Sequence, residues 1–174
     1  EETVTNGLDD LDQRCKEYNK MGAKFTKWRA VINIGDGIPT DKCIDENMSR
    51  LAKYAKIVQV NKMVPIVEPE VLMDGSHDID RCYVVTSKVL KSLFSHLVDL
   101  GVDIGGTILK PNMVISGSTC PKQAGVQEVA EKFDELYSAA GGELRNYEFA
   151  KTIITEDSNA DAAAVIEGRY GNTM

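Results

Sequence analysis

Five charged side chains interrupt three short apolar segments of the 174-residue sequence, in or near the C-terminal half of each segment. They are two lysines, an arginine and two glutamates: Lys27, Arg29, Glu68, Glu70 and Lys110. The segments have the composition of strands in an α/β domain, which are usually buried on both faces, so an unpaired charge there is costly. Each charge alone is explained by an ion pair or by contact with solvent at a strand end. The set as a whole indicates a functional site.

An amine beside a carboxylate indicates covalent chemistry on a carbonyl compound. A lysine amine is unreactive while it is protonated, and burial or a neighbouring cation lowers its ordinary pKa of about 10.4. If Lys27 faces Lys110 across adjoining strands, each amine disfavours the charge of the other. Lys110 could then attack a carbonyl and form a Schiff base, whose iminium accepts electrons while an adjacent carbon–carbon bond breaks. Glu68 could move the protons of these steps.

The alternation of side chains along a strand predicts which of these charges share a face. Lys27 and Arg29 have the same parity, opposite to that of Trp28, and Glu68 has the same parity as Glu70. Lysines and an arginine gathered in one place favour an anionic, in particular a phosphorylated, substrate. Arg29 is the candidate for holding the phosphate, although a structural ion pair explains its position almost equally well.

Helical and strand patterns alternate along the chain and must position these residues. The sequence predicts helices over residues 8–21, 40–58, 85–100 and 126–137, and strands over residues 24–34, 63–71 and the run that ends at Lys110. Thr5 or Asn6 is expected to cap the first helix, Gly22 to end it, and Thr40 to cap the second. This order is typical of parallel β/α units, which form a doubly wound sheet or a barrel. Both architectures bind ligands at the carboxyl ends of their strands.

Composition excludes several other classes of protein. A net charge of -7 and a pI near 4.9 argue against a nucleic-acid-binding protein, and no window approaches the ~20 apolar residues of a membrane span. The four cysteines form no CxxC pair and predict reduced thiols in a reducing compartment. Neither His77 nor His96 has metal-ligand spacing, and no glycine-rich nucleotide fingerprint is present. We therefore expect neither a metal site nor a cofactor.

Four longer motifs surround the charged residues. They are "GLDDLDQRC" at 7–15, "KWR" at 27–29, "VPIVEPEVLMDGSHDIDRC" at 64–82 and "GTILKPNMV" at 106–114. Together they resemble class I fructose-1,6-bisphosphate aldolase, over roughly residues 2 to 132. The resemblance implies a (β/α)8 barrel about twice as long as this chain, usually a homotetramer. It also implies metal-free catalysis in glycolysis, gluconeogenesis or the Calvin cycle.

The resemblance also implies a role for each charged residue. Lys110 matches the Schiff-base lysine of the family, and Glu68 matches its acid/base glutamate. Glu70 matches the neighbouring glutamate of the "VEPE" motif. Lys27 and Arg29 match the active-site lysine and the substrate-contacting arginine of the "KWR" motif. The predicted catalytic residues are therefore Lys110, Glu68 and Lys27, and the predicted substrate-binding residues are Arg29 and Glu70.

The sequence also departs from the family pattern. The first strands of the family, with an active-site aspartate and another lysine, would precede Glu1, and the similarity fades after Lys132. No "LSGG" or "SYGRAL" segment, which serve phosphate binding in the family, is present. We therefore expect a partial barrel of about three βα units in residues 1–137. A divergent, partly helical segment should follow in residues 138–174, with a helix from Ser158 to about Glu167.

Two functions are compatible with this reading. The first is a class I fructose-bisphosphate aldolase, or part of one, that reversibly cleaves fructose 1,6-bisphosphate to dihydroxyacetone phosphate and glyceraldehyde 3-phosphate. The second is a truncated aldolase-derived domain without activity, acting as a structural or interaction subunit of a larger complex. Because three strands cannot close a barrel, an oligomer or a partner protein is expected to cover the open edge. The expected location is the cytoplasm or the plastid stroma.

Overall fold

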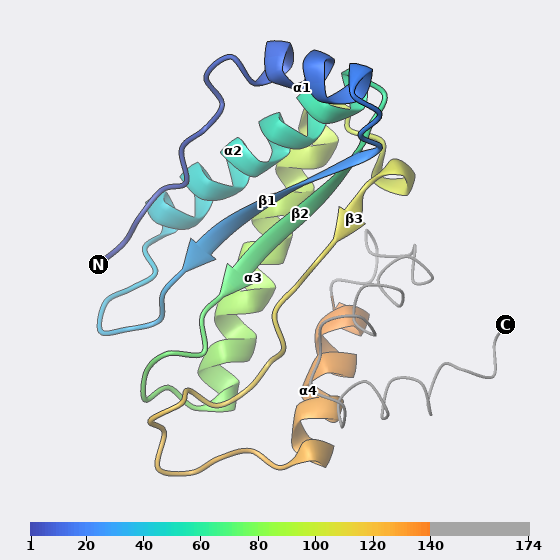
Figure 1. Ribbon diagram of the computed structural model, residues 1–174. Coiled ribbons are helices and arrows are strands. Elements are labelled where there is room, and N and C mark those ends of the chain that lie inside the picture. The colour runs from blue at the N-terminus through green and yellow to red at the C-terminus, as the bar shows by residue number, and fades with distance from the viewer. Residues whose placement is uncertain (140–174) are drawn as a thin grey trace, which may run out of the picture.

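The computed structural model describes residues 1–139, in which helices and strands alternate along the chain (Figure 1). The elements are α1 (Leu11–Lys20), β1 (Phe25–Ile32), α2 (Asp41–Val60), β2 (Val64–Val71), α3 (Ile79–Asp99), the 3-10 helix η1 (Ile104–Gly106), β3 (Ile108–Leu109) and α4 (Val126–Ala139). The predicted order of helices and strands is confirmed. The helix predicted at 158–167 lies outside the described residues, and the division at residue 137 stays a prediction.

The three strands form one parallel sheet in the order β1-β2-β3. The β1–β2 ladder is long: it pairs Phe25 with Val64 and continues without interruption to Ile32 opposite Val71. The β2–β3 ladder has two residue pairs, because β3 contains only Ile108 and Leu109. The sheet is therefore joined unevenly, firmly on one side of β2 and briefly on the other.

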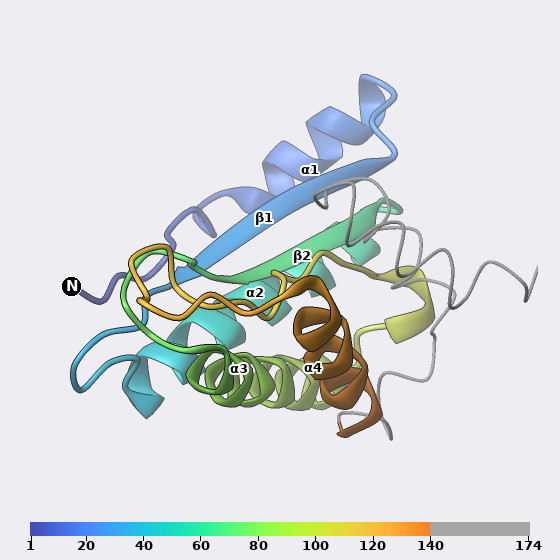
Figure 2. The same cartoon turned by 90° about the horizontal axis from the view of Figure 1, so that it is seen from below.

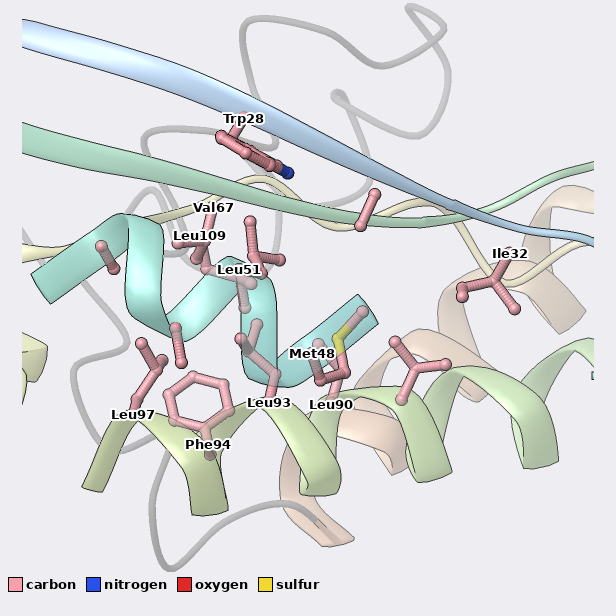
Figure 3. Packing of buried hydrophobic residues seen from close by; sticks show 14 of the residues in the cluster. Trp28, Ile32, Met48, Leu51, Val67, Leu90, Leu93, Phe94, Leu97 and Leu109 are labelled. Atoms are coloured by element: carbon pink, nitrogen blue, oxygen red, sulfur yellow. The ribbon is translucent and has the colours of Figure 1, made fainter. Parts of the chain in front are cut away.

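Helices α2 and α3 cover one face of this sheet (Figures 1 and 2). Alternate strand residues, among them Trp28, Val67 and Leu109, are buried on that face, and the apolar sides of both helices pack beneath them (Figure 3). The Trp28 ring lies 5.2 Å from the Tyr54 ring of α2, measured between centroids. The Tyr54 hydroxyl is 2.6 Å from the Thr26 hydroxyl oxygen, so this buried polar group is satisfied.

Helix α1 begins at Leu11, so the predicted start at residue 8 is wrong, as is the predicted cap. Thr5 is bonded elsewhere: its N–H donates to the Asn47 side chain and its hydroxyl donates to the Arg29 carbonyl. Asn6 accepts a hydrogen bond from Arg50. Contacts with α2 and β1 therefore take both side chains that could have capped an earlier helix start. Asp10 occupies the N-cap position without a side-chain capping bond.

Side chains cap the two long helices, and ion pairing joins α4 to α3. Thr40 accepts from the Cys43 N–H at the start of α2, as predicted. Asp78 accepts from the Arg81 N–H, so α3 begins six residues before the predicted position. In α4, Lys132 Nζ lies 2.9 Å from an Asp80 carboxylate oxygen of α3. No helix within residues 1–139 is both long enough and apolar enough to cross a membrane.

Replacing Leu51 by alanine tests the layer between α2 and the rest of the core. Leu51 is fully buried, so Leu51→Ala is expected to lower the free energy of unfolding by about 2–5 kcal/mol, measured by urea denaturation. The control is Val84→Ala in α3, whose side chain is exposed and whose loss should cost less than about 0.5 kcal/mol. Equal losses in the two variants would contradict this assignment of the core.

Candidate functional site

The five charged residues predicted from the sequence all lie on the sheet face that points away from α2 and α3. In β1, Lys27 and Arg29 alternate with Trp28 and Ala30, which are buried against the helices. Glu68 and Glu70 alternate in the same way with buried residues of β2, and Lys110 follows the buried Leu109 of β3. The common face expected from strand parity is therefore found in the structure.

Glu68 is the centre of this arrangement. One of its carboxylate oxygens lies 2.6 Å from Lys27 Nζ, and the other lies 2.7 Å from Lys110 Nζ. The Glu68 side chain is only 6% exposed, whereas Lys27 is 47% exposed and Lys110 is 27% exposed. A single buried carboxylate thus accepts one charge-assisted hydrogen bond from each of the two neighbouring strands.

The two lysines do not lie on adjoining strands, so the condition under which each would disfavour the charge of the other is not met. Strand β2 lies between β1 and β3, and it places Glu68 between the two amines. Burial alone would raise the pKa of Glu68, but the hydrogen bonds from Lys110 and Lys27 outweigh burial and hold that pKa below its ordinary value of 4.5. Glu68 is therefore a carboxylate at neutral pH, in contact with an ammonium proton on either side.

Strand register explains which residues pair. Lys27 stands opposite Ile66 and Arg29 stands opposite Glu68, so the pairs Lys27–Glu68 and Arg29–Glu70 are both diagonal, two positions along the neighbouring strand. Lys27 therefore lies in the first half of β1 rather than near its carboxyl end. The long lysine side chain reaches Glu68 in the middle of the sheet.

Arg29 forms the structural ion pair that the sequence left open as an alternative to phosphate binding. Its Nε donates to a Glu70 carboxylate oxygen, and this hydrogen bond raises the pKa of Arg29. The sheet face therefore carries two cation–carboxylate contacts side by side, one at Glu68 and one at Glu70. The first of these also includes Lys110, the amine with the less exposed side chain of the two lysines.

Asn112, which follows Lys110 and Pro111, was not found by sequence reasoning. Its side-chain oxygen accepts from the Val71 N–H at 3.0 Å, and its amide nitrogen donates to the Thr86 hydroxyl at 3.2 Å. Prolines on the neighbouring strand are the signal that could have identified it, because proline removes backbone donors from a sheet.

The described residues offer no alternative metal centre, and burial disfavours the thiolate form of three cysteines. Within residues 1–139, no group of three histidine, cysteine, aspartate or glutamate side chains could hold a metal ion. The four cysteines are free, and burial raises the pKa of the thiols of Cys15, Cys43 and Cys82. His96 lies in α3, where its Nε2 is 2.8 Å from an Asp45 carboxylate oxygen.

Comparison with known proteins assigns the family. The sequence profile of fructose-bisphosphate aldolase class-I matches residues 1–135. The chain belongs to the class I fructose-bisphosphate aldolase family. A probable class 1 aldolase of Xanthomonas axonopodis pv. citri is 56% identical over 130 residues, which cover 75% of this chain and 39% of the relative. Aldolase B of Gallus gallus is 53% identical over 129 residues, 74% of this chain and 35% of the relative.

A solved aldolase structure agrees with this family and with the partial-barrel fold. Fructose-bisphosphate aldolase of Plasmodium falciparum, in complex with TRAP and a small-molecule inhibitor, superposes with a TM-score of 0.80 at 40% identity. The superposition covers 91% of this chain and 50% of the solved chain. The present chain spans well under two thirds of the length of the aldolases it matches. Its three parallel strands with their helices correspond to part of an aldolase (β/α) barrel.

Removing one lysine tests the balance of forces at Glu68. In Lys110→Met the pKa of Glu68 should rise, because burial persists while one hydrogen bond is lost. In Lys27→Met/Lys110→Met it should rise above 4.5, because both hydrogen bonds are lost while burial persists. The measurement is a carbon-13 NMR titration of the side-chain carboxyls. Lys16→Met, which removes a distant surface pair with Asp12, is the control and should leave Glu68 unchanged.

The same balance predicts how stability depends on pH. Because the pKa of Glu68 is lower in the folded chain than its ordinary value of 4.5, the pairing stabilises the fold fully above about pH 4.5. That contribution is lost as pH falls through the folded pKa. Urea denaturation at a series of acidic pH values should therefore show a steeper loss for the unmodified chain than for Lys110→Met. A steeper loss in the variant would contradict the assignment.

Proposed function

We propose that this chain supplies the Schiff-base half of a class I fructose-bisphosphate aldolase site, with Lys110 as the nucleophile. The observation that supports it is the Glu68 carboxylate, which lies 2.7 Å from Lys110 Nζ and 2.6 Å from Lys27 Nζ. Lys110 could lose a proton to this carboxylate without any movement of the backbone. An amine and a proton acceptor in direct contact are what carbinolamine chemistry requires.

In the first stage, the Lys110 ammonium gives a proton to Glu68 as its nitrogen attacks the carbonyl carbon of a ketose phosphate. A carbon–nitrogen bond forms, the carbonyl π electrons move to oxygen, and Glu68 returns the proton to that oxygen. The carbinolamine then loses water: the hydroxyl leaves with one proton of the nitrogen, which Glu68 carries between them. The product is an iminium cation on Lys110.

In the second stage, the iminium accepts the electron pair of the neighbouring carbon–carbon bond. The hydroxyl on the leaving carbon loses its proton to the Glu68 carboxylate, this carbon departs as an aldehyde, and an enamine stays on Lys110. Protonation of the enamine and hydrolysis of the iminium release the second product and restore the amine. With fructose 1,6-bisphosphate as substrate, the products are glyceraldehyde 3-phosphate and dihydroxyacetone phosphate.

The remaining charged residues serve substrate binding and charge balance in this proposal. Lys27 holds the second oxygen of Glu68, so the carboxylate keeps a fixed orientation while Lys110 changes its bonding. Arg29, oriented by Glu70, presents positive charge on the same face as the amines and suits an anionic sugar phosphate. None of these steps requires a metal or a cofactor.

The site also needs cover on the sheet face that carries it. We assign this cover to further β/α units or to a partner subunit, because a buried, water-poor site strengthens the electrostatic contacts on which the chemistry depends. The proposed substrate is a sugar phosphate held beneath this cover. The proposed location is the cytoplasm or the plastid stroma, where the four cysteines stay reduced.

Trapping with borohydride tests the nucleophile. The folded chain is incubated with dihydroxyacetone phosphate and sodium borohydride, which reduces an iminium to a stable secondary amine. Peptide mass spectrometry should then locate the adduct on Lys110. Lys110→Arg should give no adduct at this position, and Glu68→Gln should slow trapping by about 10²–10⁴-fold because proton transfer is lost.

Lys88→Arg is the matched control, since Lys88 is a surface lysine paired with Asp41 and its replacement should leave trapping at Lys110 unchanged. A folded sample that gives no adduct on Lys110 would show that this chain does not perform the chemistry. That outcome would instead favour an aldolase-derived structural or interaction subunit.

A further inference from the structure

The central strand β2 lacks two of the backbone donors that should join it to β3. Along a strand, the backbone groups of alternate residues point to opposite neighbours. The Val67 carbonyl accepts from the Lys110 N–H at 2.9 Å, so odd-numbered residues of β2 point their backbone groups toward β3. Two of these odd-numbered residues are Pro65 and Pro69, which have no N–H.

These prolines explain why β3 is short. On the β3 side of β2, the backbone donors that remain belong to Val67 and Val71, with Pro69 between them. The register places Pro69 two residues after Val67, which belongs to the last pair of the β2–β3 ladder, and Pro111 follows Lys110 at the end of β3. Because the backbone groups of Lys110 face β2, Pro69 is the residue that would donate to the Lys110 carbonyl, and it has no N–H, so the ladder ends after the bond from Lys110 to Val67.

Asn112 makes the next connection with its side chain. Its Oδ1 accepts from the Val71 N–H at 3.0 Å, in the place of a strand carbonyl. Its Nδ2 donates to the Thr86 hydroxyl of α3 at 3.2 Å and to the Met113 carbonyl at 3.0 Å. Thr86 is fully buried, so this side chain joins the end of β2, the segment after Lys110 and the helix beneath them.

Lys110 is therefore held from both sides. The backbone N–H of Lys110 donates to the Val67 carbonyl. Two residues further along the chain, the side chain of Asn112 accepts from the Val71 N–H. Val67 and Val71 belong to β2, the strand that carries Glu68. Both connections therefore join the segment around Lys110 to the strand of its carboxylate partner. The two connections lie on either side of the residue whose Nζ is 2.7 Å from Glu68, and only the first belongs to the sheet ladder.

We propose that Asn112 is a positioning residue that replaces the missing sheet ladder and holds Lys110 against Glu68. The inference rests on the proposed role of Lys110 as the nucleophile, but the geometric part of it is independent of that role. Asn112 does not touch the reacting atoms; it acts through the backbone on either side of Pro111.

The test compares Asn112→Ala with Asn61→Ala in the full chain. Asn61 is the control, because it is an asparagine whose side chain donates hydrogen bonds to Asp12 and to the Ile57 carbonyl, but at the end of α2. Three quantities are measured: hydrogen exchange of the Val71 amide, the carboxyl titration of Glu68 by NMR, and the rate of borohydride trapping on Lys110.

In Asn112→Ala, the Val71 amide should exchange faster and the Glu68 titration should move upward, toward the ordinary pKa of 4.5, as its contact with Lys110 loosens. Trapping should slow by about 10- to 100-fold, the effect of a misplacement of about 1 Å. Asn61→Ala should change none of the three beyond its effect on overall stability.

Asn112→Asp keeps the folded chain testable if the alanine variant does not fold. Its carboxylate oxygen can still accept from the Val71 N–H, although it no longer donates to Thr86 or Met113, so the amide should stay protected and trapping should slow less than in Asn112→Ala. The proposal is overturned if a folded Asn112→Ala matches the unmodified chain in all three measurements, or if Asn61→Ala changes them equally. It is also overturned if Asn112→Asp keeps the Val71 amide protected but slows trapping as much as alanine does.

Failure of the proposed function gives a different pattern. In one outcome, the unmodified chain traps no adduct while the Glu68 titration still shifts in Asn112→Ala. This result would contradict the role of Lys110 as the nucleophile and support the positioning role of Asn112. Normal trapping in both the unmodified chain and Asn112→Ala, with the Glu68 titration and the Val71 exchange also unchanged, would remove the positioning role and keep the nucleophile.

Discussion

The structure depends on a buried carboxylate that must keep two cations. Glu68 is almost inaccessible to water, and a buried charge left without its partner costs about 3–5 kcal/mol. Its partners come from different elements, Lys27 from β1 and Lys110 from the end of β3. The three strands must therefore be parallel, adjacent and in one register for the carboxylate to be satisfied. The same condition brings a potential nucleophile and a proton acceptor into contact.

The hydrophobic layer on the other face of the sheet maintains that register. Trp28, Val67 and Leu109 point toward α2 and α3, and each is the sequence neighbour of a charged residue that points away (Figure 3). A slip of one residue would turn the charges into the core and the apolar residues out of it. Packing on one side of the sheet thus determines the electrostatics on the other.

The common face of the charged residues could be predicted from the sequence, because the side to which a strand residue points depends only on the two-residue repeat of the strand. It could not reach the pairing of Lys27 with Glu68, because the position of Lys27 opposite Ile66 depends on how two distant segments align. The start of α1 was missed for a similar reason. Thr5 and Asn6 have suitable side chains for capping, but their partners lie more than twenty residues further along the chain. Local patterns predict elements and faces, whereas non-local contacts decide register and helix ends.

The uneven ladders of β2 have a consequence for motion. Eight aligned residues join β2 to β1, but two residue pairs join it to β3, so local opening of the fold should begin at the β2–β3 boundary. The carboxylate belongs to the well-anchored side of this boundary and Lys110 to the looser side. During addition to a carbonyl, a nitrogen must follow a carbon whose geometry changes from planar to tetrahedral and back. In the proposed reaction, the short β2–β3 ladder leaves the amine some freedom to follow this change, while Asn112 keeps it close to the Glu68 carboxylate.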